Sequence, residues 1–150
     1  CSVPPLAAGR PDTMRFLDAN VLIRYLTGDL PEVLDRCTAL FQRLHDGEEQ
    51  VTLVESVVAE VVFVLSSPRL YALTGPEVAD RLKPLVLLRG VQLAHKQAIR
   101  EALDLYAAHP GLDFADALQL AHMRRLGISE IYSYDRNFDR FREWAGRVEP

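Results

Sequence analysis

The chain has 150 residues, of which 49% are hydrophobic and 25% are charged. This size and apolar content fit one globular domain with a hydrophobic core, and they exclude disordered and fibrous proteins. Its 17 basic and 21 acidic side chains leave a net charge of −4, which argues against a protein that coats nucleic acid through positive charge alone. Two cysteines are too few for a disulfide scaffold or a cysteine-based zinc site, and they fit a reducing, cytoplasmic location.

The beginning of the sequence differs from the rest. Residues 1–13 contain three prolines and a glycine without any periodicity, and Met14 stands directly before the first strand-like run. We therefore expect a flexible leader or cloning remnant over residues 1–13 and a single domain over residues 14–150. No apolar run reaches the roughly 18 residues that span a bilayer, so we expect no membrane association.

From Met14 onward, short apolar runs alternate with longer helical patterns. In chain order, we expect strands at residues 15–17, 51–54, 91–93 and 131–134, with Val148 in an edge strand. Helices are expected at residues 21–27, from Pro31 through Leu44, at 56–65, 76–82, 95–107 and 113–126, and a short one near 137–144, while residues 84–88 are ambiguous. This alternation is typical of βα units around a mostly parallel sheet of four or five strands.

Acidic side chains follow several of these strands. Ligands of parallel sheets bind beyond the carboxyl ends of the strands, and Asp18 and Asp135 directly follow the first and fourth strands. Asp113 and Asp116 open the helix at residues 113–126. Each acid also has a structural alternative, since Asp18 and Asp135 suit helix N-caps and the other two resemble a capping box.

Glu60 has a different context, because the run from Val57 to Leu65 contains no other polar residue. A helix that is apolar all round is expected to be buried, and a lone buried carboxylate costs several kcal/mol unless it is compensated. An ion pair with an arginine and a metal ion are the two alternatives. Glu55 precedes the apolar run and can reach water, so a role at the helix start suffices for it.

Together, Asp18, Glu60, Asp116 and Asp135 are expected at one edge of the sheet. Four carboxylates there would repel one another, and oxygen ligands without cysteine or histidine favour Mg²⁺ or Mn²⁺. Such ions support hydrolysis of phosphodiester bonds. The histidines show no metal-binding spacing, and the usual glycine-rich nucleotide motifs and the serine-hydrolase motif are absent.

The sequence resembles the PIN-domain nucleases, and among them the small toxins of VapC-type toxin–antitoxin pairs. The resemblance runs from Met14 to about Trp144 and depends on four segments in order: residues 16–23 (FLDANVLI), 59–62 (AEVV), 113–118 (DFADAL) and 133–138 (SYDRNF). It implies a three-layer α/β/α sandwich and a Mg²⁺- or Mn²⁺-dependent endoribonuclease, commonly homodimeric and inhibited by an antitoxin protein.

The resemblance also implies roles for particular residues. Asp18, Glu60 and Asp116 correspond to metal-binding acids of the family, Asp135 to its fourth acid, Ser133 to a hydroxyl position, and Asn20 to a polar position beside the first acid. Glu55 departs from the family pattern and adds negative charge close to the expected site.

Two other functions compete with an RNA-cleaving enzyme. One is a catalytically silent PIN-fold module that only binds proteins, although an intact set of acids argues against it. A weaker one is phosphoryl transfer to Asp18. The sequence argues against it, because it has no second acid beside Asp18 and no partner lysine after the fourth strand. Independently, the apolar stripes of the second helix and of residues 76–88 lead us to expect self-association.

Overall fold

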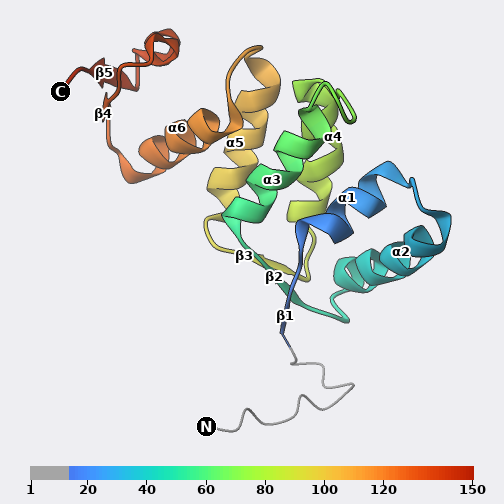
Figure 1. Ribbon diagram of the computed structural model, residues 1–150. Helices are drawn as coiled ribbons and strands as arrows, with labels where there is room; N and C mark the ends of the chain where they lie inside the picture. Colours follow the sequence, from blue (N-terminus) through green and yellow to red (C-terminus); the bar gives the residue numbers. More distant parts are fainter. Residues whose placement is uncertain (1–13) are drawn as a thin grey trace, which may run out of the picture.

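The computed structural model describes residues 14–150 (Figure 1), so the expected leader at residues 1–13 lies outside the described residues. Helices and strands alternate as the sequence predicts, which confirms the α/β class. The elements are β1 (Arg15–Phe16), α1 (Ala19–Thr27), α2 (Pro31–Asp46), β2 (Val51–Leu53), α3 (Glu55–Ser66), α4 (Gly75–Val86), β3 (Val91–Leu93), α5 (Lys96–Ala108), α6 (Phe114–Leu126), β4 (Glu130–Tyr132), the 3₁₀ helix η1 (Arg136–Phe141) and β5 (Gly146–Val148).

The first three strands form a parallel sheet in the order β1-β2-β3. One face of this sheet belongs to the core, because Val51, Leu53 and Val91 are almost fully buried. The register aligns Phe16, Thr52 and Gln92 on the opposite face. Phe16 is 76% exposed there, so that face of the sheet is largely uncovered at β1.

The last two strands form a separate parallel sheet, β4-β5. All five expected strands are therefore present, but they form sheets of three and two strands rather than one sheet of four or five. In Figure 1 the two-stranded sheet lies beyond α6, away from β1. The sequences of such short strands indicate where the backbone is extended, but they do not specify which strands pair. This is why the expected single sheet is observed as two sheets.

The core lies between the helices and the buried face of β1-β2-β3. It includes Leu22, Leu44, Leu82 and Leu103, which are fully or almost fully buried. Helices α4, α5 and α6 pack side by side in sequence order. Helix α4 continues through Pro84 to Val86, which resolves most of the ambiguous stretch as helix.

The part of the chain that the structure describes has no helix that is both long enough and apolar enough to cross a membrane.

Candidate active site

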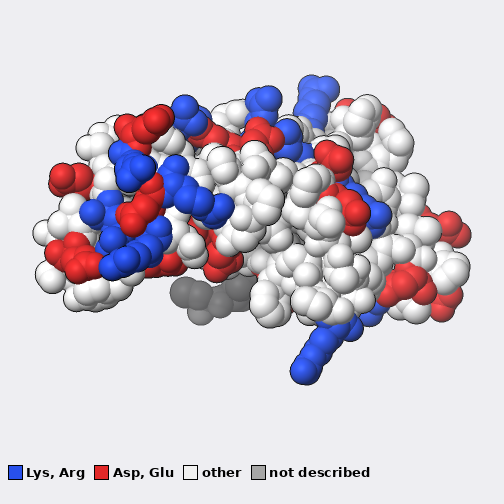
Figure 2. Space-filling model, turned by 90° about the horizontal axis from the view of Figure 1, so that it is seen from above, with Lys and Arg blue, Asp and Glu red and all other residues white. Residues whose placement is uncertain are grey.

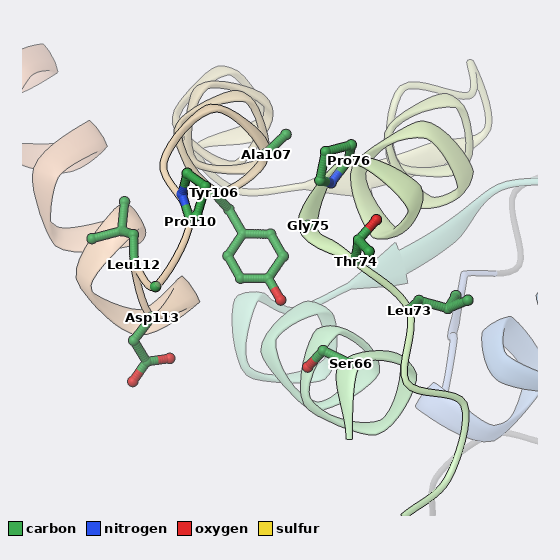
Figure 3. A pocket seen from close by; sticks show the side chains of 11 residues that line it. Ser66, Leu73, Thr74, Gly75, Pro76, Tyr106, Ala107, Pro110, Leu112 and Asp113 are labelled. Atoms are coloured by element: carbon green, nitrogen blue, oxygen red, sulfur yellow. The ribbon is translucent and has the colours of Figure 1, made fainter. Parts of the chain in front are cut away.

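A groove runs between the second half of α3 and the beginning of α6. Its narrower part has a volume of about 220 Å³ and is lined by Ala59 and Phe63 of α3 and by Phe114 of α6, among others. It adjoins a larger hollow of about 610 Å³, and Tyr106 and Asp113 line both. Figure 3 shows the Tyr106 ring projecting into the larger hollow, with Asp113 at its edge.

Three acidic side chains interact at the α6 end of this groove. Partial burial raises the pKa of the Asp116 carboxyl above its ordinary value, and the negative charges of Asp113 and Asp135 raise it further. Asp113 and Asp116 come from the start of α6, whereas Asp135 comes from the turn after β4. The structure therefore brings together two of the four expected site residues, Asp116 and Asp135, in a region of uncompensated negative charge.

Asp135 is held in place by its own turn. Its carboxylate Oδ1 accepts a hydrogen bond of 2.9 Å from the backbone N–H of Asn137, so it caps η1 as a helix N-cap would. Its backbone N–H donates to the Ser133 hydroxyl at 2.9 Å. Ser133 thus fixes the backbone of the turn that presents Asp135.

Asp18 occupies the N-cap position of α1, but its side chain makes no capping hydrogen bond. Asp18 and Asn20 are both exposed, whereas Ala19 between them is buried and fixes the start of the helix in the core. The carboxylate of Asp18 therefore does not act as the helix cap that its position suggests.

The expectation that Glu60 is buried is wrong. Glu60 is exposed, and among residues 14–150 it forms no ion pair with an arginine. Helix α3 buries Val58, Val61 and Leu65, and its opposite face, which carries Glu60, faces solvent. Phe63 on this helix is also 73% exposed. Because both faces of α3 carry apolar residues, its sequence does not indicate which face is covered.

The sequence also suggests purely structural roles for the Asp113–Asp116 pair and for Glu55, and the structure confirms a structural contact only for Glu55. The capping box expected for Asp113 and Asp116 is not formed, since the Asp113 side chain makes no capping hydrogen bond. Glu55 pairs with His122 of α6, with 3.1 Å between Oε1 and Nε2, and this contact joins α3 to α6. Glu55 therefore has a structural partner of its own.

Within residues 14–150, no three acidic, histidine or cysteine side chains lie close enough together to hold one metal ion. The four candidate acids have the right chemistry for Mg²⁺ or Mn²⁺, but one copy of the chain does not gather Asp18 and Glu60 with Asp116 and Asp135. Tyr106, which stands in the groove, was not singled out from the sequence, because a half-buried aromatic residue on a helix gives no signal beyond packing.

Comparison with known proteins identifies a family and a relative of this chain. The family model described as PIN domain matches residues 15–143. A protein named VapC ribonuclease, from Aquifex aeolicus (strain VF5), is 27% identical over 125 residues, which cover 83% of this chain and 90% of that protein.

Proposed function

Because the chain belongs to the PIN domain family, we propose that it is a metal-dependent endoribonuclease that hydrolyses RNA phosphodiester bonds, and that it is the toxin of a type II toxin–antitoxin pair. The observation that carries the proposal is the placement of Asp113, Asp116 and Asp135 beside a groove, where partial burial and the negative charges of Asp113 and Asp135 disfavour ionisation of Asp116. The similarity to a VapC ribonuclease over most of both chains supports the same activity.

We assign Asp18, Glu60, Asp116 and Asp135 as the ligands of Mg²⁺ or Mn²⁺, with Asn20 and Ser133 in supporting roles. Asp18, Glu60 and Asp116 have no hydrogen-bonded or ionic partner among residues 14–150, so their carboxylates are available to a cation. A bound cation would relieve the repulsion that Asp116 experiences from its neighbours. Within residues 14–150 of a single copy, these four carboxylates do not all lie close together, so one copy does not form the complete ligand set.

Six arginines lie between residues 124 and 147, although the chain as a whole is acidic. Figure 2 shows basic and acidic side chains mixed at the end of the molecule that carries this segment. Arg147 is bound to Asp139 at 3.0 Å and to Glu149 at 3.0 Å, and it stiffens the segment. Arg140 donates to the carbonyl of Pro110 next to the groove, where a guanidinium can also reach an RNA phosphate.

The proposal includes a cognate antitoxin protein as inhibitor, a homodimer as the active form, and a cytoplasmic location. The exposed apolar residues Phe16, Phe63 and Tyr132 offer surface for these protein contacts. The second candidate is a catalytically silent binding module, which is favoured by the incomplete ligand set of a single copy.

Cleavage of single-stranded and structured RNA, measured with Mg²⁺, with Mn²⁺ and with excess EDTA, tests the proposal. We expect cleavage only with a divalent ion, and none by the Asp116→Asn variant. Full activity in excess EDTA would contradict the metal dependence. A folded wild-type protein that cleaves no RNA with either ion would favour the binding module.

A further inference from the structure

The larger hollow beside the acidic cluster contains an aromatic ring that the core does not cover. The ring of Tyr106 packs edge-on against the buried Phe114, with ring centroids 5.9 Å apart and an angle of 86° between the two planes. This contact fixes the ring, which is half-buried and projects into the hollow of about 610 Å³ (Figure 3). A fixed aromatic ring in an open hollow is a surface on which another flat ring can stack.

The walls of this hollow suit a flat, uncharged group. Pro76 at the start of α4 and Pro110 in the α5–α6 loop line it together with the Tyr106 ring. Among the described residues, those that line it include no lysine, arginine or histidine, so the walls carry no positive charge for a phosphate. Its volume lies within the range of about 300–1,000 Å³ that is typical of sites for small organic ligands.

Asp113 supplies the charged group of the lining. It occupies the N-cap position of α6, but its side chain makes no capping hydrogen bond, so both carboxylate oxygens are available to a ligand. Two oxygens of one carboxylate can accept hydrogen bonds from two neighbouring N–H donors. Asp113 also lines the narrower groove, and its charge acts on Asp116, so the hollow adjoins the acidic site.

We propose that this hollow binds a guanine base of the RNA, next to the phosphodiester bond that is hydrolysed at the acidic site; this inference rests on the proposed function. The base stacks on the Tyr106 ring, and its N1–H and 2-amino group donate to the two carboxylate oxygens of Asp113. The sugar–phosphate chain leaves the hollow on the side of Asp116. Tyr106 and Asp113 are therefore the residues that determine which base is held beside the cleaved bond.

Guanine fits because a carboxylate accepts hydrogen bonds and does not donate them. Among the standard RNA bases, only guanine has two adjacent N–H donors on its Watson–Crick edge. Adenine and cytosine present one amino group beside a ring nitrogen whose lone pair repels the second carboxylate oxygen. Uracil presents one N–H between two carbonyl oxygens. A site with two acceptors side by side therefore leaves a polar atom unpaired with every base except guanine.

The structure favours a nucleotide over a segment of a protein partner. All residues that line the hollow belong to helices and loops, so it offers no strand edge with which an extended peptide could pair. Positive charge lies at its rim, where Arg140 Nη1 donates to the Pro110 carbonyl at 3.1 Å. An apolar hollow with a cation at its rim matches the division of a nucleotide into a flat base and a charged phosphate.

Binding of free nucleosides tests the site without cleavage. The ¹⁵N-labelled protein in excess EDTA is titrated with guanosine, inosine, adenosine, cytidine and uridine, and the amide signals of Gly75, Gly111 and Asp113 are followed by NMR. We expect guanosine to shift these signals, and inosine, which lacks the 2-amino group, to bind at least about fivefold more weakly. Tyr106→Leu should weaken guanosine binding at least about fivefold, whereas Tyr106→Phe, which keeps the ring, should change it less than about twofold.

Asp113→Asn tests the carboxylate, with Asp35→Asn as the control for the same change of charge. Asparagine presents one acceptor and one donor, so the preference for guanosine over inosine should fall below about twofold. Asp35 is exposed on α2 and lies outside the lining, so its variant should bind as the wild type does. Equal shifts with all five nucleosides would overturn the selectivity for guanine. No shift at the three amides would overturn the site and leave the hollow to a protein segment.

Cleavage of one RNA of mixed sequence connects the site to the reaction. We expect wild-type cuts to lie next to guanines, and the ratio of cuts next to guanine to cuts next to adenine to fall at least about fivefold in Asp113→Asn. Both kinds of cut are counted in one reaction, so the overall rate does not affect the ratio. An active nuclease with the same ratio in both proteins overturns the base site alone. A wild type that binds guanosine but cleaves no RNA refutes the proposed function and leaves the base site standing.

Discussion

The exposed position of Glu60 on α3 leads to a prediction that separates its chemistry from its contribution to stability. Glu60→Gln preserves the shape and removes the charge. Because Glu60 is exposed and unpaired within residues 14–150, we expect the free energy of unfolding to change by less than about 0.5 kcal/mol. Under the proposed function, the same variant loses RNA cleavage, since a carboxylate ligand has been removed.

The neighbouring Val61→Ala variant is the matched control. Val61 has no exposed surface, and the substitution removes two methyl groups, worth about 0.8 kcal/mol each, and leaves a small cavity. We expect a loss of about 2 kcal/mol, which lowers Tm by about 4–8 °C in a chain of this size, with cleavage retained below the transition.

Urea unfolding and RNA cleavage are measured on both variants. A loss of about 3–5 kcal/mol in Glu60→Gln would mean that Glu60 belongs to a buried ion pair, and it would refute the orientation of α3 described above. A stable Glu60→Gln variant that cleaves RNA at the wild-type rate would remove Glu60 from the site.

Three further predictions concern stability. Because the pKa of Asp116 is raised in the folded state, ionisation of this carboxyl at neutral pH destabilises the fold. Asp116→Asn removes the charge and should raise Tm by about 1–2 °C at pH 7. This gain should disappear as the pH falls below 3.8, where Asp116 is protonated in both states, and thermal melts recorded across this pH range would show it. Gly90→Ala would place a methyl group on the backbone carbonyl of Glu49 and 2.9 Å from the Leu44 Cα, and should cost about 1–3 kcal/mol; an unchanged urea midpoint would be inconsistent with this packing. Lys96→Met removes hydrogen bonds of 3.1 and 2.8 Å to two backbone carbonyls and should cost about 1–3 kcal/mol, whereas an equally stable variant would show that water replaces them.

Much of the fold follows from local patterns in the sequence. Gly28 and Gly127 end α1 and α6 in left-handed conformations, as expected for glycine after a helix. Pro31 opens α2, and the expected edge strand at Val148 is β5. These features depend on interactions between residues close in sequence, and such interactions are what composition and periodicity report.

The parts that differ depend on contacts between distant segments. The exposed face of α3 is apolar at Phe63 as well as charged at Glu60, so no polar stripe marks it. The division into two sheets depends on whether β4 meets β1, and strands of two or three residues are too short for their sequences to specify a partner. The family resemblance predicts the four acids as one group, whereas the separation of Asp18 and Glu60 from Asp116 and Asp135 in one copy is a property of the tertiary arrangement.

The separation of β4-β5 from the larger sheet has a consequence for amide hydrogen exchange. A two-stranded sheet is marginal by itself, whereas β2 is paired on both edges above fully buried side chains. In an isolated copy, the amides of β4 and β5 should exchange through local opening at low free energy, and those of β2 only when the whole domain unfolds. The turn that presents Asp135 belongs to the first group, so this acid would be the part of the site that loses its position first.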